Sequence, residues 1–519
     1  MELTHGLHRQ LRHSPSAVAT VSGDRRKTWE QISNRAARLA SALRSLGMGD
    51  NDRVGLLALN SDFYFEYIVA VWWGGGAINP VNTRWSPAEV AFSLDDCDTR
   101  VLLVDETFVG WSDELRSKSK SLRSIIYIGE GEGPSGTLSY EKLIADAAPI
   151  ADRRRGGEEL AGVFYTGGTT GFPKGVMLSH NALLGNALGC LLDVNFSEDE
   201  IVLAVAPMFH LAGMCLAIRT LVRGCRLVFV ETFDPVKVLE TVSIERVTFT
   251  LLVPTMLQRL IDHPGFSGYD LSSMRDVIYG ASPINEVLLD RLLKGLPDVS
   301  FYQGYGMTET GGPYTILPAW CHRSATEQNR RRLRSAGRPA WGIEMQITDG
   351  EGNEVPTGQV GEIVSRGVSL MQGYWNREAE TRAALRDGWL RSGDMGYVDE
   401  EGFLYIVDRL KDMIVSGGEN IYSAEVENVL SRHPAVASCA VIGVPSEKWG
   451  EQVHAVVVLV EGVQADAVEL REFCKQYIAA YKCPASVEFR ESLPLSGAGK
   501  LLKHVLRAPY WEGHARRVG

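Results

Sequence analysis

The segment from Tyr165 to Gly175 constrains this chain more than any other, and it reads Tyr-Thr-Gly-Gly-Thr-Thr-Gly-Phe-Pro-Lys-Gly. Glycines allow backbone N–H groups to approach phosphate oxygens, threonines add hydroxyl donors, and a lysine neutralises negative charge. The fold must therefore fix the position of a loop that binds a polyphosphate. The residues expected to bind it are Thr166, Gly167, Gly168, Thr169, Thr170 and Lys174.

This loop differs from the phosphate loop of kinases and GTPases. Their loop needs Gly-Lys followed by Ser or Thr at the start of a helix, whereas Lys174 lies between Pro173 and Gly175. The difference argues against both of those classes. Taken alone, the segment is also compatible with a flexible glycine-rich surface turn, so its interpretation depends on the rest of the chain.

Strand and helix patterns alternate along the N-terminal part. Thr28-Trp-Glu-Gln31 is a capping box, which predicts a helix N-terminus, and apolar residues follow at helical spacing until Gly47. The apolar run Arg53–Ala58 predicts a buried strand, Phe63–Trp73 a helix, and Val101–Val104 the next strand. This alternation predicts an α/β fold with several layers.

A second α/β unit is expected after the charged stretch Asp408–Asp412. A chain of 519 residues exceeds the usual size of a single hydrophobic core. Beyond the stretch, Ser423 is expected to cap a short helix, and strand and helix patterns continue to a final helix at Leu501–Leu506. We therefore predict a large N-terminal domain at residues 1–410 and a smaller C-terminal domain at residues 411–519.

Composition excludes several classes of protein. The net charge of −11 argues against a nucleic-acid partner, and the eight cysteines contain no Cys-x-x-Cys pair that would suggest a zinc site or a disulfide framework. Cysteines of this kind fit a reducing cytoplasm. Met1–Ser16 lacks the apolar centre of a signal peptide, and no apolar stretch is long enough to span a bilayer. We expect a cytoplasmic protein without a transmembrane segment.

Four further segments follow the loop in the order expected of one family, and the resemblance runs from about Lys27 to about Arg507, nearly the full chain. They resemble the adenylate-forming superfamily of acyl-CoA synthetases, aryl-CoA ligases, nonribosomal adenylation domains and luciferases. One departure is that the family loop usually has Ser where this chain has Gly167, which removes a hydroxyl and keeps the backbone amide. The four segments are Tyr302-Gln-Gly-Tyr-Gly-Met-Thr-Glu309, Trp389-Leu-Arg-Ser-Gly-Asp394, Asp408-Arg-Leu-Lys-Asp412 and Pro494-Leu-Ser-Gly-Ala-Gly-Lys500.

The resemblance implies an N-terminal adenylation and acyl-binding domain and a mobile C-terminal domain that carries the catalytic lysine. A carboxylate attacks the α-phosphorus of ATP, pyrophosphate leaves, and the thiol of coenzyme A then attacks the acyl-adenylate. Lys500 matches the family lysine that bridges carboxylate and α-phosphate oxygens. Glu309 matches the carboxylate beside Mg²⁺, with Thr308 donating to phosphate, and His210 is expected to gate between carboxylate and thiol entry.

The same resemblance implies how the nucleotide binds. Asp394 would accept both ribose hydroxyls, Arg409 would assist at ribose or phosphate, and Tyr305 would stack on the adenine. Without the other motifs, Asp394 would be interpreted as a turn residue and Arg409 as part of a surface ion pair. Lys411 matches the hinge position of the family. The remaining residues expected to bind nucleotide or the coenzyme A arm are Gly280, Ala281, Ser282, Gly304, Gly306, Met307, Gly417 and Gly418.

The superfamily contains three other activities that the sequence must be compared with. An amino-acid adenylation enzyme has Asp after the Phe of the pocket motif, and this chain has Phe209-His210 instead. An acyl-AMP ligase that serves a carrier protein and a luciferase-like oxygenase share the motifs and stay open. A homodimer is one of the oligomeric states that the sequence leaves open.

The acid itself is expected to have an apolar tail. By the resemblance, the pocket walls are His210–Met214, Tyr279–Ser282 and Gly311–Tyr314, in which the ionisable side chains are His210 and the phenols of Tyr279 and Tyr314. Burying a second charge of the substrate there without a partner would be costly. We favour medium- or long-chain fatty acids, with aryl or alicyclic acids as the alternative, and we expect dicarboxylates and amino acids to be poor substrates.

Overall fold

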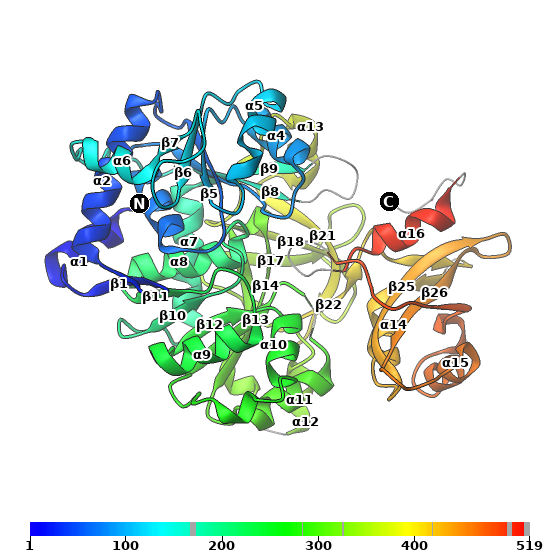
Figure 1. Cartoon of the computed structure of the whole chain (residues 1–519). Coiled ribbons are helices and arrows are strands. Elements are labelled where there is room, and N and C mark those ends of the chain that lie inside the picture. Colours follow the sequence, from blue (N-terminus) through cyan, green and yellow to red (C-terminus); the bar gives the residue numbers. More distant parts are fainter. Residues whose placement is uncertain (167–172, 283, 324–325, 418, 496–500, 513–519) are drawn as a thin grey trace.

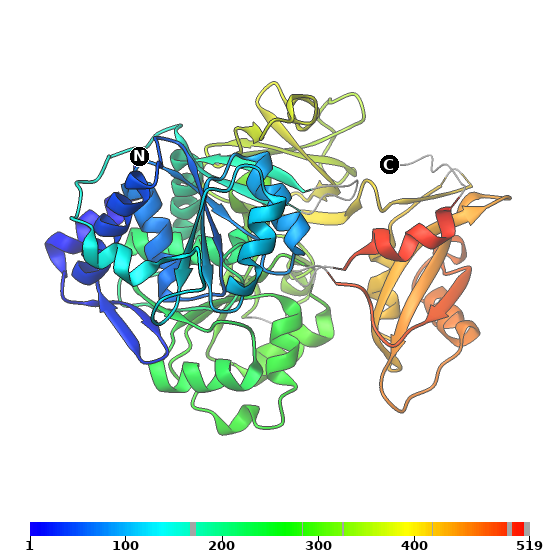
Figure 2. The same ribbon diagram turned by 45° about the horizontal axis from the view of Figure 1, so that its top comes forward.

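The structure is a computed structural model that describes residues 1–166, 173–282, 284–323, 326–417, 419–495 and 501–512. Figure 1 shows a large N-terminal part and a smaller C-terminal domain, drawn in orange and red, that stands apart from it. The turned view of Figure 2 shows the same separation. The predicted α/β class, with a large N-terminal and a smaller C-terminal domain, is confirmed. The division at residues 410 and 411 stays a prediction.

Two large sheets form the N-terminal part. In the described residues the first sheet has nine strands, in the order β16 (Arg338–Pro339), β15 (Gly312–Leu317), β14 (Ser300–Met307), β13 (Asp276–Gly280), β12 (Phe249–Leu252), β10 (Ile201–Ala204), β11 (Arg226–Phe229), β1 (Val18–Ser22) and β2 (Arg25–Thr28). The second sheet has eight described strands, in the order β19 (Gly373–Tyr374), β9 (Lys174–Ser179), β8 (Leu160–Thr166), β4 (Ala77–Pro80), β3 (Arg53–Leu57), β5 (Val101–Asp105), β6 (Ser124–Ile128) and β7 (Leu138–Ser139).

Two smaller sheets follow. The first consists of β17 (Ile343–Thr348), β18 (Gly361–Gly367), β21 (Trp389–Val398) and β20 (Leu385–Arg386), with β22 (Leu404–Arg409) also paired to β21. The second belongs to the C-terminal domain and consists of β24 (Glu419–Ile421), β23 (Ile414–Ser416), β26 (Gly450–Leu459) and β25 (Val436–Ser446), with β27 (Ser486–Phe489) paired to β26.

Helices cover the faces of these sheets. The N-terminal α-helices are α1 (His5–His13), α2 (Trp29–Ser45), α3 (Asp62–Trp73), α4 (Pro87–Asp96), α5 (Ser112–Lys118), α6 (Tyr140–Asp146), α7 (His180–Asp193), α8 (Leu211–Arg223), α9 (Pro235–Glu245), α10 (Pro254–Ile261), α11 (Glu286–Gly295), α12 (Glu327–Arg332) and α13 (Glu378–Ala384). Those of the C-terminal domain are α14 (Ser423–Leu430), α15 (Ala467–Lys475) and α16 (Lys503–Trp511). Short 3-10 helices are η1 (Val109–Trp111), η2 (Phe266–Gly268), η3 (Thr308–Thr310), η4 (Ala319–Cys321) and η5 (Ala480–Lys482).

The main core lies between the two large sheets. It combines buried side chains of both sheets with those of α2, α3, α7 and α8. Helix α3 is buried on nearly every side, which explains why its sequence is apolar almost throughout rather than amphipathic. A second core lies under α9, α10 and α11 on the other face of the nine-stranded sheet. Among the described residues, no helix combines the length and the apolar character needed to cross a bilayer.

The helix signals of the sequence can be checked directly. Thr28 and Gln31 form the predicted capping box at the start of α2, and Gly47 has the positive φ of 97° expected after a helix end. The prediction that Ser423 caps a helix is wrong, because Tyr422 is the N-cap of α14 and Ser423 is its first residue. Asp408 of strand β22 caps α14 instead, because its carboxylate accepts hydrogen bonds from Ser423 N at 2.5 Å and from Ser423 Oγ at 2.7 Å.

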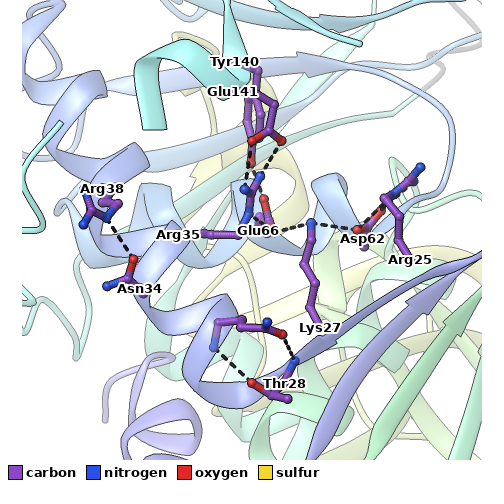
Figure 3. Close-up of polar contacts among 11 residues, drawn as sticks. Arg25, Lys27, Thr28, Asn34, Arg35, Arg38, Asp62, Glu66, Tyr140 and Glu141 are labelled. Atoms are coloured by element: carbon purple, nitrogen blue, oxygen red, sulfur yellow. Dashed lines mark hydrogen bonds and ion pairs between the residues drawn. The ribbon is translucent and has the colours of Figure 1, made fainter. Parts of the chain in front are cut away.

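A buried ion-pair network ties α2, α3 and α6 together (Figure 3). Glu66 is fully buried in α3, and its Oε1 lies 2.5 Å from Lys27 Nζ and 2.7 Å from Arg35 Nε. The Tyr140 hydroxyl donates to Glu66 Oε2 at 2.7 Å. Arg35 also pairs with the half-exposed Glu141. A buried carboxylate needs such partners, because without them nothing would offset the free energy of removing its charge from water.

Candidate functional site

The phosphate-binding loop predicted from the sequence is anchored at the end of the eight-stranded sheet. Strands β8 and β9 are antiparallel, and Thr166 pairs with Lys174 where they meet the loop. The Thr166 hydroxyl donates to the Lys174 carbonyl at 3.5 Å. Of the predicted loop residues, Gly167, Gly168, Thr169 and Thr170 lie outside the described residues. The two described ends are held together by the sheet, as a loop that binds an anion requires.

Lys174 and Glu309 are linked through one aromatic residue, Tyr374. The Lys174 ammonium lies over the Tyr374 ring, 5.2 Å from its centre, and the Tyr374 hydroxyl donates to Glu309 Oε1 at 2.8 Å. Tyr374 reaches this position because β19 pairs with β9, so that Tyr374 lies opposite Val176. The fold thus gathers a cation, a phenol and a carboxylate at the mouth of the loop.

Glu309 is held by the turn that ends β14. It lies in η3, is only 8% exposed, and its carbonyl accepts the backbone N–H of Met371 at 2.9 Å. The Thr310 hydroxyl donates to the Gly312 carbonyl at 2.7 Å, and the Met307 N–H donates to Thr310 Oγ1 at 3.0 Å. Thr308 begins the same turn. This bonding fixes the backbone around the carboxylate.

The predicted nucleotide residues Tyr305, Asp394 and Arg409 come together across two sheets. The Tyr305 hydroxyl donates to Asp394 Oδ2 at 2.5 Å, and Arg409 Nε lies 3.4 Å from Asp394 Oδ1. Asp394 and Arg409 face each other on the antiparallel strands β21 and β22. Burial raises the pKa of the Tyr305 hydroxyl, so it donates to the carboxylate as a neutral phenol. Asp394 and Arg409 belong to consecutive strands, but Tyr305 lies 89 residues before Asp394, so only tertiary structure brings it to this pair.

Four predicted residues lie where β13 ends beside the parallel strand β14. Gly280 of β13 pairs with Gly304 of β14, and a Cβ on Gly280 would come within 2.1 Å of the Gly304 carbonyl oxygen. A Cβ on Gly306 would meet the Gly312 carbonyl at the same distance. Ala281 has a positive φ of 63°, an unusual backbone for a residue with a side chain. The backbones at Gly280 and Gly306 therefore pack against neighbouring strands too closely to leave room for a side chain.

His210 and the C-terminal residues occupy separate places. His210 is the N-cap residue of α8, and its ring packs against Phe209 with the ring centres 4.3 Å apart.

Gly417 lies between β23 and β24 with a φ of 61°, and its N–H donates to the Trp449 carbonyl within the C-terminal domain. The structure does not bring Gly417 into the Asp394 cluster, and Gly418 and Lys500 lie outside the described residues. Burial lowers the pKa of Lys411, two residues beyond Arg409.

Sequence analysis missed Tyr374. The signal available was a short Gly-Tyr-Trp segment after a long charged and polar region, and such aromatic residues are usually explained by packing. Only the pairing of β19 with β9 places its hydroxyl on Glu309. In the described ranges, no group of three or more His, Cys, Asp or Glu side chains forms a site able to hold a metal ion by itself.

Comparison with known proteins bears on this arrangement. The model of the AMP-binding enzyme family matches residues 7–375, and that of the AMP-binding enzyme C-terminal domain matches residues 425–500. A feruloyl-CoA synthase of an Amycolatopsis species is 39% identical over 96% of this chain and 97% of its own length. A medium/long-chain-fatty-acid–CoA ligase of Mycobacterium tuberculosis is 36% identical over 98% and 90%. The structure of o-succinylbenzoate CoA synthetase from Bacillus subtilis, bound to its acyl-adenylate intermediate, superposes with a TM-score of 0.85 at 30% identity, covering 96% of this chain and 97% of that one.

Proposed function

Because the chain belongs to the family of AMP-binding enzymes and is an acid–thiol ligase, we propose that it joins a carboxylic acid with a bulky, mainly apolar tail to coenzyme A. One observation above all supports the proposal: Tyr374 contacts both Lys174, at one end of the phosphate-binding loop, and Glu309. This contact supports assigning the cation to phosphate and the carboxylate to a metal ion.

The proposed reaction has two steps because a carboxylate has no good leaving group. A carboxylate is a poor electrophile, so its oxygen first attacks the α-phosphorus of ATP, and the bond to pyrophosphate breaks. The thiol sulfur of coenzyme A then attacks the acyl carbon, loses its proton, and AMP leaves. The first step brings two anions together, so positioning and fixed positive charge must supply most of the acceleration. We assign that charge to Lys174 and Lys500.

Glu309 suits the magnesium ion that the resemblance implies. Magnesium is usually held by one or two carboxylates together with substrate phosphates and water, so a site without a full cage of protein ligands fits it. Glu309 is buried, and its Oε1 is held in place by the Tyr374 hydroxyl. When bound there, Mg²⁺ would neutralise phosphate charge. We assign Thr308, which follows β14 directly, to donate to a phosphate oxygen.

The second half-reaction uses the C-terminal domain. We propose that Lys411 lies at the hinge of that domain, and that Gly417 and Gly418 move to the coenzyme A arm once the acyl-adenylate has formed. In the arrangement described here, Gly417 contacts Trp449 of its own domain, and we propose that rotation of the whole domain brings it to the site. His210, at the start of α8, is assigned to the passage between acid and thiol.

Two substrate classes have support. The fatty-acid class rests on small residues in the proposed walls and on the relative that acts on medium- and long-chain fatty acids. The aryl class rests on the feruloyl-CoA synthase, which has the higher identity of the two relatives. A specific observation also favours the aryl class: a buried arginine on α8, described below, which a plain hydrocarbon tail would leave without an oxygen acceptor.

Pyrophosphate release over a panel of acids, with and without coenzyme A, tests the proposed function. We expect octanoate, laurate, coumarate and ferulate to be activated, and coenzyme A to yield a thioester. Malonate and succinate should be poor substrates because they have no apolar tail to fill the pocket, and amino acids should be poor substrates because they would bring a charged ammonium group into it without a partner. A clear preference for malonate, succinate or an amino acid would contradict the assignment of the pocket.

Asp394→Ala should raise the KM for ATP much more than the KM for the acid. We assign Asp394 to the ribose hydroxyls, which belong to the nucleotide alone, so its loss removes binding of ATP. Titration of each substrate at saturating levels of the other measures the two effects. Asp113→Ala, at a highly exposed acid, is the control. An unchanged KM for ATP would remove Asp394 from the site.

A further inference from the structure

Arg219 is a fully buried arginine for which the described residues supply neither an oxygen acceptor nor a counter-charge. It lies in α8 with 1% of its surface exposed, and it is among the largest fully buried side chains. None of its three guanidinium nitrogens has an oxygen acceptor or a carboxylate partner among the described residues, and its one hydrogen-bond partner there is the weakly accepting thiol of Cys190. Arginine does not lose its charge at physiological pH, so the cation cannot escape this environment by deprotonation.

The surroundings of Arg219 do not balance its charge. Its field acts on the thiols of Cys190 and Cys215, and burial raises the pKa of both, that of Cys215 to about 12, so both are neutral. Neutral thiols are weak acceptors. Asp193, at the end of α7, forms no ion pair with Arg219, and a backbone hydrogen bond from Trp341 acts on its carboxyl. An isolated buried charge is costly, so this side chain is suited to a partner that arrives from outside the chain.

The same region adjoins the proposed acid pocket. Helices α7 and α8 lie side by side (Figure 1), and Cys215, one turn before Arg219, donates to the Gly311 carbonyl at 3.6 Å. Cys190 donates to the Pro313 carbonyl, also at 3.6 Å. A Cβ on Gly312 would lie 2.7 Å from the Cys215 sulfur. Arg219 is thus placed next to the Gly311–Tyr314 wall.

The spacing along α8 sets the distance from the reacting end. His210 and Arg219 are nine residues apart, which corresponds to about 13 Å of helix rise. Side chains in a helix point back toward its N-terminus, so the guanidinium lies closer to His210 than that. A substrate with its carboxylate near His210 would need a tail of about one aromatic ring and a short chain, or six to eight carbons, to reach it.

We propose that Arg219 binds an oxygen acceptor at the far end of the carboxylic acid, and so selects acids with an oxygen there over plain hydrocarbon acids. This inference rests on the proposed function. The acceptor is a phenolic oxygen on an aryl acid or the second carboxylate of a long dicarboxylate. Malonate and succinate are too short to reach Arg219, so the expectation that they are poor substrates is unchanged.

Matched substrate pairs and one conservative variant test the proposal. The pairs are coumarate against cinnamate, and octanedioate against octanoate, each differing only in the distal oxygen group. We expect wild type to prefer the oxygen-bearing member of at least one pair. Arg219→Met should reduce that preference by about 10- to 100-fold, the value of a hydrogen bond to a charged group, with kcat/KM for cinnamate and octanoate unchanged or raised. The pair that responds identifies phenol or carboxylate as the source of the oxygen.

Controls separate a binding role from a structural one. Arg223→Met, one turn further along α8, should leave both preferences unchanged. The thermal midpoint of Arg219→Met without substrate should equal or exceed that of wild type, because an unpaired buried charge is removed. A marked fall in that midpoint, or preferences that change less than about twofold, would overturn the proposal. If wild type releases pyrophosphate with none of the acids, the proposed function fails and this inference fails with it.

Discussion

Lys500→Ala should slow formation of the acyl-adenylate by about 10²- to 10⁴-fold, the range for losing a donor that stabilises a transition state. Formation of the thioester from supplied acyl-adenylate should remain largely intact. The reason is that the first step brings the carboxylate and the α-phosphate together, and Lys500 is proposed to bridge them, whereas the attack of the thiol does not build up the same charge. Pyrophosphate release and single-turnover thioester formation measure the two steps separately.

The matched control for Lys500→Ala is Lys475→Ala in α15. Lys475 is an exposed lysine of the same domain that pairs with Glu472, and exposed ion pairs contribute little, so both half-reactions should be unchanged. Equal losses in the two half-reactions of Lys500→Ala would contradict its assignment to the first step alone.

Glu66→Gln should destabilise the N-terminal domain by about 3 kcal/mol, the lower end of the range for breaking a buried ion pair. The amide cannot balance Lys27 and Arg35, and the Tyr140 hydroxyl meets a changed acceptor. The lower end applies because Lys27 keeps Asp62 and Arg35 keeps Glu141. Thermal unfolding should show a lower midpoint for the N-terminal transition, while the C-terminal domain, which lacks this network, should unfold as in wild type.

Glu141→Gln is the control within the same network (Figure 3). Glu141 is about half exposed and contacts the same Arg35, so its loss should cost less than about 1 kcal/mol. Similar effects of the two substitutions would show that burial does not determine the energetics of this network.

Much of the local structure was predictable because its signals are local. The capping box at Thr28, the strand at Arg53–Ala58 and the helix at Phe63–Trp73 depend on residues a few positions apart, and each lies within a residue or two of the observed element. Ser423 is the instructive failure. Its sequence context is that of an N-cap, yet the strand that ends at Arg409 brings Asp408 to the helix start, and the carboxylate takes over the cap.

The candidate site divides in the same way. The α/β class, the order of the motifs and the residue types of the phosphate loop follow from the sequence, because glycine, threonine and lysine act there through their own chemistry. Three contacts and environments follow from tertiary structure instead: Tyr374 touches Glu309, Tyr305 donates to Asp394, and Arg219 is buried without a counter-charge among the described residues. These facts depend on the pairing of strands and the packing of helices that lie far apart in the chain, and a side chain's burial and partners are properties of that packing rather than of its neighbours in sequence.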